Sequence, residues 1–264
     1  MKHWLGLARF LAALLWTNLK SALALRGSFV LQVTFMALNN LTYFVFWWVL
    51  FTKVPTLRGY GLREVYAMFG VSAAGFGLVY AVVGGVRHLG RFIDEGELDP
   101  LLVQPKPTLL YAIGSRSQPS GWGDVLSGLV FLGLSGYVRP GNVPLVLLAL
   151  ACSACTFLGA GIAFFSLAFW LRKTEMLSRQ LWELLIAFSL YPEPLFGGAL
   201  RFVLFTALPV GFISYLPVRV LRSENPVDVL SMVAGAAAVL VTGAWLFGRG
   251  LRRYSSGSRF GVFG

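Results

Sequence analysis

Acidic residues are scarce in this chain. Only 11 of its 264 residues are Asp or Glu, against 22 Lys and Arg, and charged residues make up 12% of the total. A soluble domain carries roughly 25% charged residues. Hydrophobic residues instead reach 57%, and the mean hydropathy is +0.73. The composition excludes an ordinary soluble domain and indicates a membrane protein with several spans.

Residue patterns for catalysis and metal binding are also rare. The two histidines, His3 and His88, are predicted to lie on polar flanks, and the sequence has no GxxxxGK[ST], HExxH or GxSxG motif. A phosphate-loop ATP site is therefore excluded. We expect no catalytic residue, no metal ligand and no cofactor bound by this chain. The two cysteines, Cys152 and Cys155, lie in an apolar run without nearby His or acidic residues, so packing is favoured over metal or redox chemistry and their role stays open.

Six apolar segments predict transmembrane helices, since about 20 such residues cross a ~30 Å hydrocarbon core. Their period is helical, which excludes the alternating pattern of an outer-membrane barrel. The third segment is too short if it covers only 124–137, so it begins near Tyr111 or after a polar turn at 115–121. We predict one all-α membrane domain over 1–264, with spans at 28–51, 65–86, a third ending near 137, 143–171, 176–196 and 227–247.

Two further segments are apolar without being ordinary spans. Residues 1–26 place Arg9 and Lys20 on one helical stripe opposite tryptophans, which predicts an interfacial helix. As a transmembrane span, this segment would hold both charges at costly depth. Residues 200–217 are broken by Pro209, Gly211 and Pro217, which predicts a re-entrant hairpin between the fifth and sixth spans. A full seventh span there would put the C-terminal arginines outside.

The basic residues indicate the orientation. With six spans and an inner N-terminus, most of the 22 Lys and Arg residues fall on the cytoplasmic side, as the positive-inside rule requires. We therefore predict cytoplasmic N- and C-termini. The net charge of +11 is then explained by an anionic inner leaflet, and we expect no nucleic acid as a partner. The residues that carry this bias near the C-terminus and after the fourth span are Arg172, Lys173, Arg249, Arg252, Arg253 and Arg259.

Small residues recur at spacings of four and three along 65–86 and predict a helix-packing face. Such residues let backbones approach closely where lipid gives no hydrophobic drive. The partner helix lies either in the same subunit or across a dimer. The face consists of Gly70, Ala74, Gly77, Ala81 and Gly84.

Polar residues inside the spans are few. Asn39 and Asn40 either hydrogen-bond a neighbouring helix or line a substrate pathway. Glu183 either pairs with Arg179, four residues earlier, or lines a polar pathway. Asp124 is predicted near the inner end of the third span.

The most acidic stretch, 88–105, lies between the second and third spans. Four of the chain's 11 acids fall within 94–99, so the stretch must lie in water and is the best candidate for contact with another protein. A merely solvated loop is the alternative. The residues expected to make the contact are Arg91, Phe92, Asp94, Glu95, Glu97, Leu98, Asp99, Leu101 and Leu102.

The order of these features resembles the permease subunit of a type 2 ABC exporter. The resemblance lies in the N-terminal helix, six spans, the GELDPLL and QP sequences at 96–105, and the broken segment before the last span. Tyr191-Pro192, Pro209 and Tyr215-Leu216-Pro217 are similar to a poorly characterised bacterial subgroup. The resemblance implies a bacterial inner-membrane dimer with the same or a homologous permease. It also implies two separate ABC ATPase subunits that bind ATP and Mg, with 88–105 as their coupling helix and 200–217 capping the exit.

Two other functions stay open. A carrier or channel without ATP is one, although carriers show broken helices in two matching halves and only one broken segment is present. A neighbouring gene for a phosphate-loop protein would favour the exporter. A membrane enzyme or scaffold is the other, and a deep polar cavity joining Asp124 and Glu183 would favour an enzyme. The sequence does not indicate the transported substrate.

Overall fold

The computed structural model describes residues 2–171 and 174–255, and these ranges are almost entirely helical. Within them the only β pairing is an isolated bridge between Leu57 and Tyr60. The predicted all-α fold is therefore confirmed. Of the residues used for orientation, Arg172, Lys173 and Arg259 lie outside the described ranges. The α-helices are α1 (Lys2–Ala24), α2 (Arg26–Lys53), α3 (Leu62–Val83), α4 (Leu89–Asp94), α5 (Asp99–Leu102), α6 (Thr108–Gly114), α7 (Ser120–Ser135), α8 (Val143–Phe165), α9 (Glu175–Ser189), α10 (Gly198–Val203), α11 (Leu216–Ser223) and α12 (Pro226–Leu251).

Four helical segments of the described chain are long and apolar enough to cross a membrane alone. They are Arg26–Lys53, Leu62–Asp94, Pro140–Phe169 and Pro226–Leu251. The other two predicted spans correspond to α7 and α9, which have 16 and 15 residues. At 1.5 Å per residue these helices are only about 24 and 22 Å long. The helix α9 ends at Ser189 shortly before Pro192 and Pro194, which cannot continue it. Six spans therefore stay a prediction.

The predicted packing face of α3 lies against α7 of the same chain. A Cβ added to Gly128 of α7 would lie 2.5 Å from the backbone nitrogen of Ala74, and one added to Gly77 would lie 2.5 Å from the carbonyl oxygen of Gly121. Only glycine permits this backbone contact. Gly84 lies beyond the contact with α7, and its nearest neighbour is the Gln118 side chain. The helix at the third predicted span, α7, begins at Ser120, within the polar turn at 115–121 and not near Tyr111.

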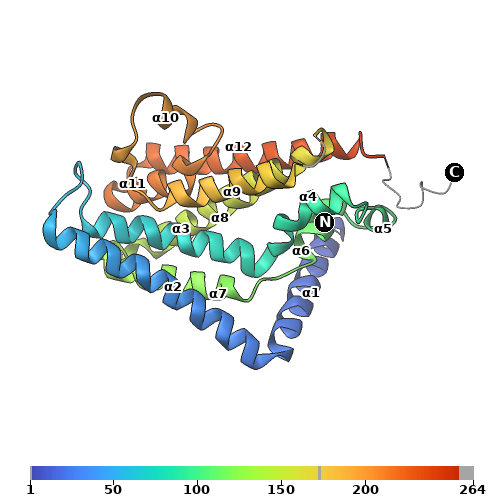
Figure 1. Cartoon of the computed structure of the whole chain (residues 1–264), viewed down its shortest axis with the longest axis horizontal. Helices are drawn as coiled ribbons and strands as arrows, with labels where there is room; N and C mark the ends of the chain where they lie inside the picture. Colours follow the sequence, from blue (N-terminus) through green and yellow to red (C-terminus); the bar gives the residue numbers. More distant parts are fainter. Residues whose placement is uncertain (1, 172–173, 256–264) are drawn as a thin grey trace.

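The long helices run side by side, with short helices at both ends of the bundle (Figure 1). The helices α4, α5 and α6 lie at the same end as the N-terminus and the last turn of α12; we call this the α5 end. The helix α10 and the loop between α2 and α3 lie at the opposite end, the α10 end. The helix α1 turns away from α2 at Leu25, whose ψ of 65° breaks the helix. It is thus a separate helix, as predicted, and its interfacial position stays a prediction.

The broken segment before α12 extends further than the sequence indicated. The helix α10 is followed by a turn, a π-helix (Gly211–Tyr215) and α11, which continues past residue 217 to Ser223. Pro217 stands where the π-helix runs directly into α11. Ile213, Val218 and Val220 are fully or almost fully buried in the bundle. The helix that contains Pro217 thus extends to Ser223, and a re-entrant hairpin over 200–217 stays a prediction.

Candidate functional site

A polar cavity of about 340 Å³ lies between α2, α3, α7 and α9. Small-molecule sites typically have volumes of about 300–1,000 Å³ and apolar walls with a few converging polar groups. The apolar wall includes Tyr43, Phe69, Phe76 and Phe157. The polar side chains at the cavity are Asn39, Asn40, Ser72, Arg87, Ser120, Asp124, Glu183 and Ser189.

Asp124 lines this cavity and is only 3% exposed. Its Oδ1 accepts a hydrogen bond of 2.8 Å from Nδ2 of Asn40, which joins α7 to α2. Its Oδ2 is buried and has no hydrogen-bond partner among the described residues. The close α3–α7 contact through Gly121 and Gly128 positions this turn of α7 beside the cavity. A buried acid with an unused oxygen is costly, which makes Asp124 a candidate functional residue.

An ion pair lies at a more exposed part of the cavity wall. Arg87 Nη2 is 3.9 Å from Glu183 Oε1, and the two side chains are 33% and 56% exposed. The Arg87 guanidinium also lies 5.2 Å from the Tyr80 ring, which stacks on Trp182 with an interplanar angle of 8°. Sequence reasoning did not identify Arg87 and Tyr80 as cavity residues, because they are far in sequence from Asp124 and Glu183 and share no local motif with them. Only the fold brings them together.

Of the two alternatives for Glu183, the pair with Arg179 is wrong. Arg179 Nη2 lies 2.6 Å from Glu175 Oε1, one turn earlier on α9. Glu175 and Glu183 are each four residues from Arg179, so the sequence spacing favoured neither. Glu183 instead faces the segment after α3, which supplies Arg87.

The three residues considered for a pathway, Asn39, Asn40 and Glu183, all line this one cavity. Asn39 is exposed, whereas Asn40 is 4% exposed and bonded to Asp124. Asn40 thus joins two helices and lines the cavity at the same time. Asp124 and Glu183 also share the cavity, but each has a different partner on a different helix.

The acidic stretch at the α5 end is divided between buried and exposed side chains. Phe92 and Leu98 are buried in the chain's own core, so they cannot enter another protein. Asp94, Glu95 and Glu97 are exposed. Their basic neighbour is Arg91, whose Nη2 lies 4.0 Å from Glu97 Oε1. The apolar side chains left on the surface are Leu102, which is 43% exposed, and Val103, which is 82% exposed.

Val103 was not among the predicted contact residues, although a solitary valine beside Gln104 and Pro105 was visible in the sequence. Leu101 is half-buried and packs against the core cluster. Asp99 accepts a hydrogen bond of 2.8 Å from the Tyr254 hydroxyl, just beyond α12. The acidic stretch is therefore attached to the segment that follows α12.

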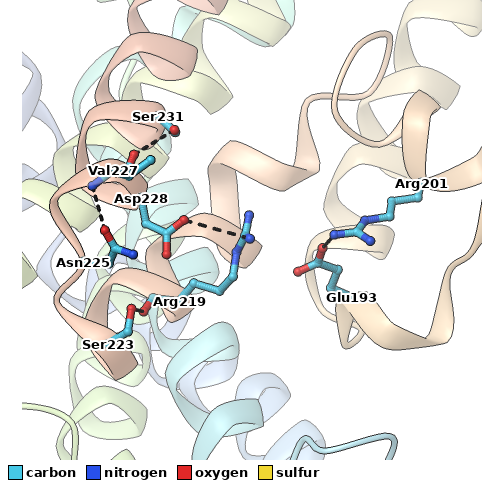
Figure 2. A network of polar contacts seen from close by, with 8 residues as sticks. All are labelled: Glu193, Arg201, Arg219, Ser223, Asn225, Val227, Asp228 and Ser231. Carbon is cyan, nitrogen blue, oxygen red and sulfur yellow. Dashed lines mark hydrogen bonds and ion pairs between the residues drawn. The ribbon is translucent and has the colours of Figure 1, made fainter.

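Polar contacts also fix the α10 end (Figure 2). Arg201 Nη2 of α10 lies 2.7 Å from Oε1 of Glu193, a residue only 7% exposed. Burial and the nearby Glu193 charge raise the pKa of Tyr60 in the α2–α3 loop to about 12, so its hydroxyl stays protonated. Arg219 of α11 faces Asp228 of α12 at 3.9 Å. These contacts hold α10 and α11 against the bundle.

No group of three or more His, Cys, Asp or Glu residues in the described chain could hold a metal ion. Cys152 and Cys155 are free thiols on α8, and Cys152 is buried. Packing therefore stays the prediction for both.

Comparison with known families gives one match. The family described as ABC-2 family transporter protein matches residues 37–258, which is most of the chain. No curated protein and no solved structure matches it. The match extends from α2 to beyond α12 and includes both the polar cavity and the acidic stretch. This chain belongs to the ABC-2 family of transporter proteins, as a multi-pass membrane component of transport.

Proposed function

We propose that the chain is the permease subunit of an ATP-driven ABC exporter, and that it works as a dimer with two separate ATPase subunits. The observation that carries this proposal is the ABC-2 family match over residues 37–258. The chain contains no phosphate loop, so ATP and Mg would be bound by the partner subunits. The cytoplasmic side of the bacterial inner membrane is then the side of the α5 end.

The surface at the α5 end is suited to an ATPase contact. It presents three exposed acids beside exposed Leu102 and Val103. Apolar side chains can fill a groove, while the acids meet basic residues and give the contact its specificity. Because Phe92 and Leu98 anchor the same stretch in the core, a pull on it would move α3 and α8 as well. Packed interfaces of this kind switch between discrete arrangements.

The path of that motion leads to the cavity. The helix α3 continues into the segment Gly84–His88, which carries Arg87, and then into α4. ATP binding would close the ATPases and displace α4 and α5. The displacement would then change the distance between α3 and α9 across the Arg87–Glu183 pair. Alternating access at the cavity follows from this coupling.

The test is the association with the ATPase. The tagged chain is purified from its native membrane in mild detergent, and phosphate-loop proteins in the sample are identified and assayed. Replacing Leu102 and Val103 together by Asp should lower the recovered ATPase at least about tenfold. A loss of only about 1.4 kcal/mol of binding free energy is enough to weaken the affinity tenfold. The control is Val138→Asp, an exposed position in the loop after α7. Unchanged recovery in the double variant would refute docking at this surface.

A membrane enzyme is the second candidate, because Asp124 and Glu183 line one cavity. The separate partners of the two acids and the family match weigh against it. Chemical turnover by the purified chain without an ATPase would favour the enzyme. Solute movement by the purified chain alone would favour a carrier.

A further inference from the structure

The charges in the polar cavity do not balance. Arg87 faces Glu183, whereas the side chain bonded to Asp124 is the neutral amide of Asn40. Asp124 Oδ2 has no hydrogen bond from any described residue, and the residue is only 3% exposed. A buried carboxylate is strongly unfavourable unless a cation or a hydrogen-bond donor faces it. The cavity therefore holds one acid for which the described residues provide no cationic partner.

The walls around Asp124 suit a particular counterpart. The rings of Tyr43, Phe69 and Phe76 line the same cavity, and aromatic faces attract cations. The chain already uses this interaction nearby, where the Arg87 guanidinium lies 5.2 Å from the Tyr80 ring. A ligand with a cationic centre and an apolar body would satisfy the carboxylate and the rings together. An anionic ligand would be repelled.

We propose that this cavity binds an amphipathic organic cation as transported cargo, with the cationic centre at Asp124 and the apolar body against the aromatic wall. This inference rests on the proposed function, since it names the class of substrate for the same permease. The volume of about 340 Å³ accommodates a small drug-sized molecule. Asn40 is then a positioning residue, because its amide fixes one carboxylate oxygen and leaves the other facing the cargo.

The test uses two ions of nearly the same shape and opposite charge, tetraphenylphosphonium and tetraphenylborate. The complete permease complex is placed in lipid nanodiscs, and binding of each radiolabelled ion is measured by equilibrium dialysis, with empty nanodiscs subtracted. We expect saturable binding of the cation that is at least about tenfold tighter than binding of the anion. Equal affinity for the two ions, or no saturable cation binding, would overturn the proposal. This comparison needs no variant.

Variants then locate the site. Asp124→Asn keeps the side-chain shape and should weaken cation binding about tenfold or more while leaving anion binding nearly unchanged. Asp124→Glu, which keeps the charge, should recover part of the loss. The control is Glu175→Gln, an exposed acid of α9 that does not line the cavity. Equal weakening of both ions by Asp124→Asn would show a purely structural role and would refute the assignment.

A second readout separates this inference from the proposed function. ATP hydrolysis by the complex is measured with and without tetraphenylphosphonium. Cation-selective binding without any associated ATPase activity would support the site and contradict the exporter. ATPase activity that no cation stimulates, together with equal binding of both ions, would support the exporter and contradict the site.

Discussion

The helices α3 and α12 have similar hydropathy but differ in burial. Their spans have mean hydropathies of 1.8 and 2.0, yet 78% of the apolar window of the first is buried and only 17% of that of the second. For α2 the buried share is 6%. Hydropathy thus shows which helices can leave water but not which of them occupy the interior. Small residues bring both helices to backbone distance of a neighbour: Gly77 brings α3 against α7, and Gly243 brings α12 against α8. The helix α3 is more buried because it packs against both α7 and α8.

The largest expected effect comes from filling the contact between α3 and α7. Gly128→Leu would push a side chain against the backbone of α3, where even a Cβ would lie 2.5 Å from the Ala74 nitrogen. We expect a loss of about 3 kcal/mol or more, and much of the protein to be recovered unfolded. The matched control is Gly133→Leu on the same helix, where an added Cβ meets no atom within 4 Å. The stability of both variants is measured by thermal unfolding in detergent. Equal unfolding midpoints would contradict the close packing of α3 against α7.

The exposed face of α2 is the next place to test the comparison. Under the proposed dimer, this face meets the second permease while α12 meets lipid, because α2 and not α12 borders the polar cavity. In a background without Cys152 and Cys155, Leu38→Cys should give a cross-linked dimer in the membrane and Val241→Cys should not. Both positions are well exposed in the single chain, at 53% and 67%. Cross-linking through position 241 and not through position 38 would indicate that α12 forms the dimer interface in place of α2.

Buried and exposed ion pairs provide a third contrast. Arg201–Glu193 and Arg179–Glu175 have nearly equal distances, 2.7 and 2.6 Å, but the acid side chain is 10% exposed in the first pair and 46% in the second. Arg201→Ala should cost about 1–3 kcal/mol, because it leaves a buried carboxylate without its cation. Arg179→Ala should cost at most about 0.5 kcal/mol, as solvent screens the exposed pair. Unfolding midpoints measured side by side would contradict the argument if the two losses were equal.

Two local features could be predicted from the sequence. They are the packing face with Gly70, Ala74 and Gly77, and the helix break at Pro209. The pairing of side chains could not be predicted, even within one helix. Arg179 had two acids at equal spacing, and only the fold shows that Glu183 meets Arg87 instead. Burial was equally hidden, because Phe92 and Leu98 look like surface anchors in the sequence yet belong to the core. Local periodicity carries no information about such contacts between distant segments.

The smallest expected effect concerns the contact between Tyr254, just beyond the exposed helix α12, and the acidic stretch. Tyr254→Phe removes the hydroxyl that donates to Asp99 but keeps the ring that packs edge-on against Phe169. The global loss should be about 0.5–1.5 kcal/mol. Hydrogen exchange should nevertheless rise locally over 99–104, because α5 has only 4 residues and depends on tertiary contacts. If exchange there stayed unchanged while α12 itself frayed, the bond would serve the helix end and not the acidic stretch. A rise confined to 99–104 would mean that Tyr254 helps to hold the surface on which an ATPase is proposed to pull.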